Sequence, residues 1–318
     1  MYRVGVDLGG TNIAVGIVNE AYHILGRASV KTALPQPAEG ICDRIAEAIR
    51  LAAADAGVEL SQLYGIGIGS PGLIDPTAGV VIFANNLGFD NVPLAAMVSD
   101  RVGGLPCSVG NDANAAAYGE FIAGSGKGTT NFIMVTIGTG IGGGIIINRH
   151  IYAGSNHAGG EIGHIVIESD GLPCSCGKRG CFERYASATA LIEQTKAAMQ
   201  GDPHSKMWEL CGGDIDRVSG RTAWEARAQG DATAAGVVEQ YIRYLSVGVS
   251  SIITIFQPDA LCLGGGVSLE GRGLTDPLHE LIYETSFLQS IKEKSVITTA
   301  TLGNDAGIIG AAFLPDAN

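Results

Sequence analysis

Residues 2–18, Tyr-Arg-Val-Gly-Val-Asp-Leu-Gly-Gly-Thr-Asn-Ile-Ala-Val-Gly-Ile-Val, hold two short apolar runs separated by a glycine turn. We therefore expect strands over 2–7 and 13–18. Beyond a further strand, apolar residues recur at helical spacing over 39–56, and an alternating strand follows over 64–69. Strands and a helix in this order indicate an α/β unit.

The turn of this strand pair, Asp7-Leu-Gly-Gly-Thr11, is suited to binding an anion. The backbone N–H groups of Gly9, Gly10 and Thr11 can point toward a phosphate, and the Thr11 hydroxyl is a further donor. Asp7 ends the first strand, where a carboxylate can hold Mg²⁺ through retained waters. Taken alone, the segment fits a plain glycine hairpin as well as a phosphate site.

A second turn of the same kind follows a strand expected over 132–137. Gly138-Thr-Gly-Ile-Gly142 separates it from a return strand over 145–148, and a third glycine cluster, 264–266, follows a strand over 260–263. No Gly-Lys-Ser/Thr follows either turn, which excludes a Walker A loop, and the Gly-x-Gly-x-x-Gly fingerprint of dinucleotide folds is absent after the first strand. Two glycine hairpins in two units indicate a nucleotide held across a cleft.

The rest of the chain also alternates strands and helices, which predicts mixed α/β architecture. The further elements expected are a strand over 107–110, a helix over 113–123, mainly helices over 187–256, a strand over 296–302 and a helix from Ala306 with Asp305 as its N-cap. Residues 128–148 carry no charge, but their six glycines suit a spanning helix poorly. We interpret them as the second strand pair.

The composition describes an acidic globular chain. Its 318 residues predict roughly two domains at about 150 residues each. The 20 Lys and Arg residues against 32 Asp and Glu give a net charge of -12, which argues against nucleic acid or an anionic membrane as partner. The first residues lack the basic and apolar regions of a secretory signal, so we expect a cytoplasmic protein.

The sharpest local signal is three cysteines, Cys174, Cys176 and Cys181, with His164 ten residues upstream of the first. In a reducing compartment such a cluster is more often a metal site than a disulfide framework. Three thiolates and one imidazole form a structural zinc set that leaves no open coordination position. The alternative is a group of ordinary buried thiols. We expect structural Zn²⁺.

Asn111 and Asp112 follow the strand over 107–110 and open the next helix. A carboxylate there can simply cap the helix, or it can be a general base that takes a proton from a substrate hydroxyl during phosphoryl transfer. Because Glu161 and Glu183 lie within three residues of expected zinc ligands, one metal can fix both. A polyhydroxylated ligand needs such rigid polar groups. The polar residues on these loops are Asn85, Asn86, Glu161, His164 and Glu183.

Together these motifs resemble the ROK family of bacterial sugar kinases, most closely its glucokinases. The resemblance spans nearly the whole chain, and the ordered combination is specific although each piece alone is weak. It implies an actin-like fold, in which two ribonuclease-H-like domains flank a cleft that closes on ATP and sugar. The pieces are Asp7-Leu-Gly-Gly-Thr11, Asn111-Asp-Ala-Asn-Ala-Ala116, Gly138-Thr-Gly-Ile-Gly-Gly143, Gly160-Glu-Ile-Gly-His164, Cys174-Ser-Cys-Gly-Lys-Arg-Gly-Cys-Phe-Glu183 and Leu302-Gly-Asn-Asp-Ala-Gly307.

The resemblance also implies domains and site residues. Residues 1–112 with 305–318 would form the N-terminal α/β domain, and 113–304 a larger α/β domain with the zinc loop. Asp112 would be the base toward the 6-hydroxyl of a hexose, and His164 would meet both zinc and sugar. The implied sugar contacts are Gly72, Asn86, Asn111, Asp112, Glu161, His164 and Glu183; the ATP and Mg²⁺ contacts are Asp7, Gly9, Gly10, Thr11, Asn12, Gly138, Thr139, Gly140 and Gly265; the zinc ligands are His164, Cys174, Cys176 and Cys181.

One residue departs from the family pattern. Many relatives carry a lysine directly after the first glycine turn, where this chain has Asn12. Without that ammonium, Mg²⁺ and the backbone dipoles carry more of the charge stabilisation near the phosphates. The base and the sugar site are not affected.

The implied activity is that of an ATP:hexose 6-phosphotransferase, most closely one that converts glucose to glucose 6-phosphate. Kinases for N-acetylmannosamine, N-acetylglucosamine, mannose, allose or fructose share most of these motifs and remain alternatives. A sugar sensor and an ATP-binding module without transfer activity are further alternatives. The family's repressors carry a winged helix-turn-helix, for which we expect no room before the first strand. Sugar and ATP are the expected partners, and we expect a homodimer or homotetramer, as is common in the family.

Overall fold

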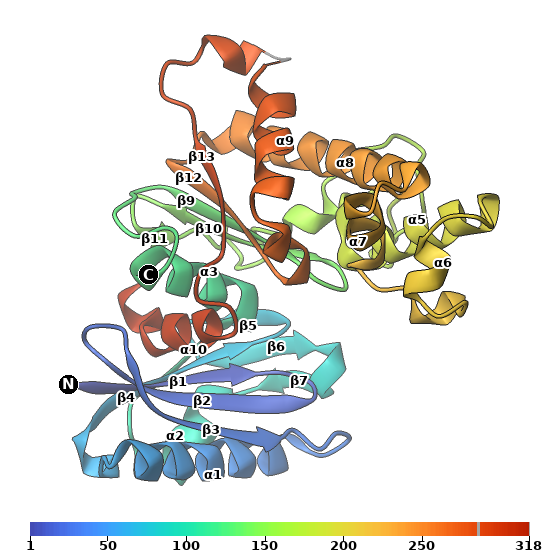
Figure 1. Cartoon of the computed structure of the whole chain (residues 1–318). Helices are drawn as coiled ribbons and strands as arrows, with labels where there is room; N and C mark the ends of the chain where they lie inside the picture. The colour runs from blue at the N-terminus through green and yellow to red at the C-terminus, as the bar shows by residue number, and fades with distance from the viewer. Residues whose placement is uncertain (285–286, 318) are drawn as a thin grey trace. The chain divides into compact units, whose positions relative to one another are not determined.

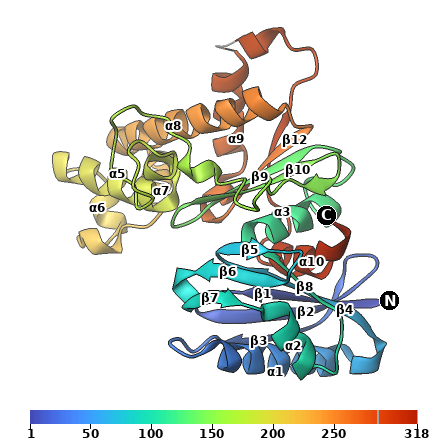
Figure 2. The same cartoon turned by 180° about the vertical axis from the view of Figure 1, so that it is seen from behind.

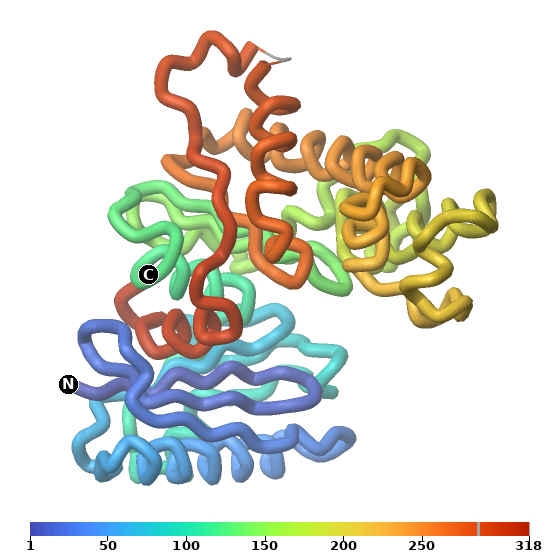
Figure 3. The backbone as a smooth tube through the Cα atoms, viewed as in Figure 1, coloured from blue at the N-terminus to red at the C-terminus, as the bar shows by residue number. Residues whose placement is uncertain are grey.

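The computed structural model describes residues 1–284 and 287–317; Asn318, the last residue of the expected N-terminal domain, lies outside them. The chain forms two compact units. Unit 1 comprises Met1–Met134, Gly144–Gly160 and Thr301–Asn318, and unit 2 comprises Val135–Gly143 and Glu161–Ala300. The blue N-terminal strands and the red C-terminal helix therefore belong to the same unit (Figures 1 and 3).

Unit 1 is built on a five-stranded sheet with the order β3-β2-β1-β4-β8. The first three strands form an antiparallel meander, and β4 and β8 run parallel to β1. The bounds are β1 (Tyr2–Leu8), β2 (Asn12–Asn19), β3 (Ile24–Lys31), β4 (Leu63–Ser70) and β8 (Cys107–Asn111). A small antiparallel sheet comprises β5 (Leu73–Asp75), β6 (Val80–Ala84) and β7 (Phe89–Val92).

Helices cover both faces of the large sheet of unit 1 (Figures 1 and 2). One face carries α1 (Ala38–Ala56) and α2 (Leu94–Arg101); the other carries α3 (Asp112–Ala123) and α10 (Asp305–Ala312). The apolar stripe predicted over 39–56 is buried, since Ile41, Ile45 and Ile49 lie in the core. The predicted return of the C-terminal helix to the first unit is also confirmed, because α10 packs on β1, β4 and α3.

Glycines in two strands allow α10 to lie directly on the sheet. A Cβ added at Gly5 would overlap the carbonyl oxygen of Ile308, and one at Gly67 would overlap that of Ala311. Both glycines therefore serve a close backbone approach. The consequence is that α10, which carries residues near the predicted phosphate turn, is fixed against the strands that position that turn.

The second five-stranded sheet has the order β11-β10-β9-β12-β13. Its strands are β9 (Phe132–Ile137), β10 (Ile141–Ile147), β11 (His150–Ile151), β12 (Ala260–Gly264) and β13 (Val296–Thr299). The helices of unit 2 are α4 (Glu183–Ala186), α5 (Ala188–Gly201), α6 (Met207–Leu210), α7 (Thr222–Ala228), α8 (Ala232–Phe256) and α9 (Arg272–Tyr283). The long helix α8 packs against α5, α7 and α9.

The α/β expectation is confirmed, and two details differ. The second glycine turn is shorter than expected, because β10 already begins at Ile141 and takes in the glycines that follow. The helix α3 packs with unit 1 against α10 and β4, whereas the expected division at residue 112 assigned it to the larger domain. Residues 128–148 contain β9 and β10, and no helix of the described part of the chain is long and apolar enough to cross a membrane.

Candidate active site and metal cluster

Two acidic side chains of unit 1 lie at the edge of its sheet where the parallel strands end. Asp7 of β1 pairs in register with Gly69 of β4, and Gly69 pairs with Gly110 of β8. Asp112 directly follows Asn111, the last residue of β8. Because parallel strands have their carboxyl ends at one edge of a sheet, the fold brings these two carboxylates together, and such an edge is where α/β proteins bind ligands.

The cap of helix α3 is Asn111 and not Asp112. The Asn111 side-chain oxygen accepts hydrogen bonds from the backbone N–H groups of Ala113 at 2.9 Å and Asn114 at 3.1 Å. Its amide nitrogen donates to the carbonyl oxygen of Gly72 at 3.3 Å. The Asp112 carboxylate accepts from the Ala113 N–H at 2.9 Å, and no described side chain bonds to it. Asp112 is thus free to meet a ligand.

The electrostatic surroundings of both carboxylates oppose ionisation. Burial raises the pKa of Asp112, and the backbone N–H groups near it lower that pKa only in part. Burial also raises the pKa of Asp7, and the negative charge of Asp112 raises it further. A bound cation would relieve this repulsion. Both carboxylates are therefore harder to ionise than an exposed aspartate.

The first glycine turn is held by the strand that lies beside it. The Gly9 N–H donates to the carbonyl oxygen of Asn12 at 3.0 Å. Thr32 donates its hydroxyl to the carbonyl oxygen of Gly9 at 2.6 Å and its N–H to that of Thr11 at 2.9 Å. Thr32 is fully buried and has no place among the predicted site residues. The antiparallel register of β2 and β3 could have identified it.

Two predicted sugar contacts of unit 1 come from the small sheet and the residues around it. A Cβ at Gly10 would lie 3.7 Å from Nδ2 of Asn86, so Asn86 lies beside the glycine turn. Gly72 has a φ of 102°, and a Cβ there would collide with the carbonyl oxygen of Phe83. Glycine is therefore required at 72, where the carbonyl anchors the Asn111 side chain.

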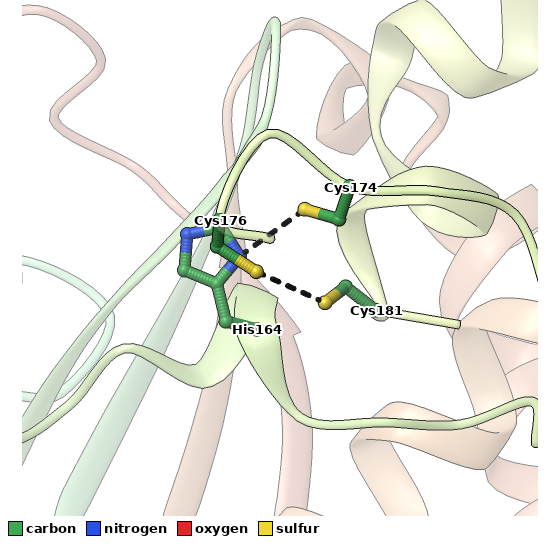
Figure 4. Close-up of side chains that lie close together, drawn as sticks. All are labelled: His164, Cys174, Cys176 and Cys181. Carbon is green, nitrogen blue, oxygen red and sulfur yellow. Dashed lines mark hydrogen bonds between the residues drawn. The ribbon is translucent and has the colours of Figure 1, made fainter. Parts of the chain in front are cut away.

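The four predicted zinc ligands lie together in unit 2 (Figure 4). Their ligand atoms all lie within 4.8 Å of one another; Nδ1 of His164 is 3.6 Å from Sγ of Cys174, and Sγ of Cys176 is 3.5 Å from Sγ of Cys181. A tetrahedral zinc site with a Zn–S bond of about 2.3 Å separates ligand atoms by about 3.5–3.8 Å. The donor set and its spacing fit Zn²⁺.

Glu183 contacts this cluster directly. Its Oε1 is 3.0 Å from Sγ of Cys174 and 3.6 Å from Nδ1 of His164. Its Oε2 lies on the side of the second glycine turn, since a Cβ at Gly140 would be 2.6 Å from it. Glu161 is exposed at the start of the short 3-10 helix that carries His164. Glu183 therefore contacts the cluster with its side chain, whereas Glu161 is connected to the cluster only because it lies three residues before His164 in the sequence.

The second glycine turn and the third glycine cluster meet in unit 2. The Gly138 N–H donates to the carbonyl oxygen of Gly140 at 3.0 Å, and Thr139 between them is exposed. Gly265 has a φ of 89°, and a Cβ there would overlap the carbonyl oxygen of Ile137, directly before the turn. The predicted nucleotide contacts of unit 2 therefore form one surface.

The expected capping role of Asp305 is wrong. Its side chain makes no cap hydrogen bond and instead forms a two-pronged ion pair with Arg27 of β3, at 2.5 and 2.6 Å. This pair raises the pKa of Arg27 and lowers that of Asp305. The difference arises because the fold places β3 next to the start of α10. This contact joins residues that are far apart in sequence, so the sequence around Asp305 does not reveal it.

A groove of about 680 Å³ lies in unit 1 beside the first glycine turn. It extends from the glycine turn over β2 and β3 to the start of α10. Its lining residues are Asp7, Gly9, Gly10, Thr11, Asn12, Ala14, Val15, Arg27, Ala28, Ser29, Asn304, Asp305 and Ile308. The groove gives a ligand at the turn access to both Asp7 and the face of β3.

Comparison with known proteins gives matches over nearly the full length. Residues 3–317 match the family described as ROK family. The glucokinase of Streptomyces coelicolor is 38% identical over 313 residues, which cover 98% of this chain and 96% of the relative. A ROK family glucokinase from Streptomyces griseus, solved with glucose and AMPPNP, has 38% identity and a TM-score of 0.80 over 99% of both chains. A ROK hexokinase from Thermus thermophilus has 32% identity and a TM-score of 0.82, covering 99% of this chain and 97% of that one.

Proposed function

The chain belongs to the ROK family, and from this premise we propose that it is an ATP-dependent hexose kinase that converts glucose to glucose 6-phosphate. Its fold is the actin-like two-domain fold of sugar kinases. The observation that carries the proposal is the Asp112 carboxylate, which no described side chain engages and which shares a sheet edge with Asp7. The glucokinase relatives support glucose as the sugar.

Asp112 is the proposed general base. It takes the proton of the sugar 6-hydroxyl as that oxygen attacks the γ-phosphorus of ATP. Burial raises its pKa, which makes the ionised carboxylate a stronger proton acceptor than an exposed aspartate. Asn111 holds the start of α3 through its cap and its bond to Gly72, and so fixes where Asp112 points.

The first glycine turn and Asp7 are the proposed phosphate and metal contacts of unit 1. The N–H groups of Gly10 and Thr11 would donate to phosphate oxygens, and the Gly9 N–H, which donates to Asn12, would keep the turn in shape beside them. The side chain of Asp7 would hold Mg²⁺ through water. When bound, Mg²⁺ supplies positive charge against the phosphates. In unit 2, the proposed nucleotide contacts are Gly138, Thr139, Gly140 and Gly265.

The cysteine cluster has a structural role in this proposal. His164, Cys174, Cys176 and Cys181 would hold Zn²⁺, whose closed shell orders the loop around it. Glu183 contacts two of the ligands, so the ordered loop fixes its carboxylate. Glu161, His164 and Glu183 are the proposed sugar contacts of unit 2, and Gly72, Asn86, Asn111 and Asp112 those of unit 1. We further propose a cytoplasmic homodimer or homotetramer.

A coupled assay for ADP release tests the activity. The protein is supplied with MgATP and each of a panel of hexoses and N-acetylhexosamines, and kcat/KM is measured for every sugar. We expect the kcat/KM for glucose to exceed that for the other sugars by at least about two orders of magnitude, because a sugar that leaves hydrogen-bonding groups of the site unpaired is strongly rejected. The ROK glucokinase from S. griseus is the matched reference enzyme.

The other outcomes separate the alternatives. Preference for mannose, allose, fructose or an N-acetylated sugar would keep Asp112 as the base and overturn glucose as the substrate. Sugar binding by calorimetry without turnover of any sugar would instead identify a sensor. Nucleotide binding without sugar binding would identify an ATP-binding module.

A further inference from the structure

The phosphate turn of this chain lacks a cation of its own. Gly9, Gly10, Thr11 and Asn12 are uncharged, and the two titratable side chains described at this strand edge, Asp7 and Asp112, are acidic. The negative charges of Asp7 and Asp112 would repel a triphosphate bound at this turn. Mg²⁺ offsets only part of this repulsion, since ATP carries about four negative charges near neutral pH, so a further cation is expected nearby.

Lys31 lies in register directly opposite Asn12. The antiparallel pairing of β2 and β3 matches Asn12 with Lys31, Ala14 with Ser29 and Gly16 with Arg27. Residues paired in this way project from the same side of a sheet, with their Cβ atoms about 4.5–5.5 Å apart. Lys31 therefore projects from the side of the sheet on which Asn12 lies.

This side of the sheet is the one that carries the groove. Asn12, Ala14 and Ser29 line it, and a Cβ at Gly16 would meet Ile308 of α10. The alternate residue Ile13 is buried in the core on the other side. Lys31 lies two residues beyond Ser29 on β3 and is paired with Asn12, which lines the groove, although Lys31 is not itself a lining residue. The ammonium of a lysine stands on a flexible four-carbon stem, and here that stem starts opposite Asn12, the residue that directly follows the turn.

The backbone beside Lys31 is fastened to the turn. Thr32 bonds to the carbonyl oxygens of both Gly9 and Thr11. These bonds fix the position of the Lys31 Cα relative to the N–H groups that would receive phosphate. The side chain itself is exposed and makes no ion pair or side-chain hydrogen bond with any residue in 1–284 or 287–317.

Arg27 is the other cation on this side of β3, and it is less suited. Both of its terminal nitrogens bond to the Asp305 carboxylate, which neutralises its charge. It is also four residues from Lys31 along the strand, about 13 Å at the usual rise. Lys31 is thus the cation of β3 whose charge is uncommitted and adjacent to the turn.

We propose that Lys31 is a phosphate-binding residue, which supplies from β3 the positive charge that Asn12 does not supply from β2. The proposal rests on the proposed function, because it assumes that MgATP binds at this turn. Its ligand class is the polyphosphate of a nucleoside triphosphate. The ammonium group donates to phosphate oxygens, where charge-assisted hydrogen bonds are strongest.

The test compares Lys31→Gln with the wild-type protein and with Lys127→Gln. Lys127 is an exposed lysine beyond the far end of α3 from Asp112, so its replacement changes the net charge equally. Calorimetry measures the Kd for Mg-AMPPNP and for adenosine. We expect Lys31→Gln to weaken Mg-AMPPNP binding about tenfold, the loss of one charge-assisted contact. Adenosine affinity and Tm should not change, and Lys127→Gln should bind as the wild type does.

A second variant places the charge back on the other strand. Asn12→Lys in the Lys31→Gln background should restore Mg-AMPPNP affinity, because its ammonium starts from the paired position. Equal Mg-AMPPNP affinity in wild type and Lys31→Gln would overturn the proposal, as would equal weakening by Lys127→Gln. These binding measurements do not depend on sugar turnover. A protein that binds Mg-AMPPNP through Lys31 but phosphorylates no sugar would overturn only the proposed function.

Discussion

Asp7 and Asp112 lie close enough that, after the effect of its own burial, the charge of Asp112 raises the pKa of Asp7. Burial also raises the pKa of Asp112 itself. Unpaired carboxylates in such places destabilise a fold when they are ionised. Their position at one sheet edge therefore costs stability, and the proposed chemistry accounts for that cost, because Asp7 would hold the metal and Asp112 would take the proton.

Replacing Asp112 with Asn should separate catalysis from stability. We expect kcat to fall by about 10²- to 10⁴-fold, the usual contribution of a general base. We expect Tm at about pH 8 to rise, since the variant no longer buries an ionised carboxylate. Steady-state kinetics and calorimetric unfolding measure the two effects. Asp100→Asn, an exposed aspartate on α2, is the control and should change neither. Near-normal turnover in Asp112→Asn would refute the base assignment.

The raised pKa of Asp112 sets the sign of two pH effects. Because the base acts only when it is ionised, the acid limb of kcat/KM should lie above the ordinary pKa of an aspartate. The stability of the fold depends on the same carboxyl group. Ionised Asp112 destabilises the fold in full at a pH above its raised pKa in the folded state. It has no such effect at a pH below the ordinary pKa that it has in the unfolded state. The Tm advantage of Asp112→Asn should therefore grow as pH rises through that window and vanish near pH 3, below the ordinary value of about 3.9. An advantage that is independent of pH would contradict this origin.

Sequence patterns predicted the elements that bury a regular stripe or alternate along a strand. The helix over 39–56 and the strand over 132–137 were predicted closely because their burial follows the local period. The start of β10 was not predicted, because its glycines read as a turn. Gly144 lies in the strand since α3 packs closely on it: a Cβ at Gly144 would overlap that of Ala117. Close packing between segments distant in sequence leaves no local signal.

The residues of the candidate site also fall into those that a local sequence pattern predicts and those that depend on contacts between distant segments. The cluster of His164 with three cysteines was predicted because the cysteines are close in sequence and distinctive. Asn111 and Asp112 are both good capping residues, so sequence alone could not assign the cap to the first. Thr32 bonds to the glycine turn, and Lys31 lies opposite Asn12, only through the register of β3 against β2, which depends on the length of the intervening hairpin. Pairing between strands was the missing information.

The contact of α10 with the sheet predicts a steric effect at Gly67. Gly67→Ala places a Cβ against the carbonyl oxygen of Ala311, and we expect it to lower the free energy of unfolding by about 1–3 kcal/mol, as overpacking does. Gly236→Ala is the control: it lies inside α8 with open space around it and should raise stability by about 0.5–1 kcal/mol. Chemical denaturation measures both. Equal changes in the free energy of unfolding for the two variants would show that the close approach of α10 to the sheet does not affect stability.

Cys176→Ser tests whether the cysteine cluster orders the sugar contacts. Cys176 is the exposed member of the set, so its replacement removes a ligand with little direct loss of packing. We expect the purified variant to lose the one Zn²⁺ per chain that elemental analysis should find in the wild type, because a zinc shell with three protein ligands binds more weakly. Glu183 contacts Cys174 and His164, so the loosened loop should also weaken glucose binding, measured by calorimetry. Cys107→Ala, which changes a cysteine of β8 outside the cluster, should keep both metal and sugar. Loss of zinc with unchanged glucose affinity would show that the cluster does not position the proposed sugar contacts.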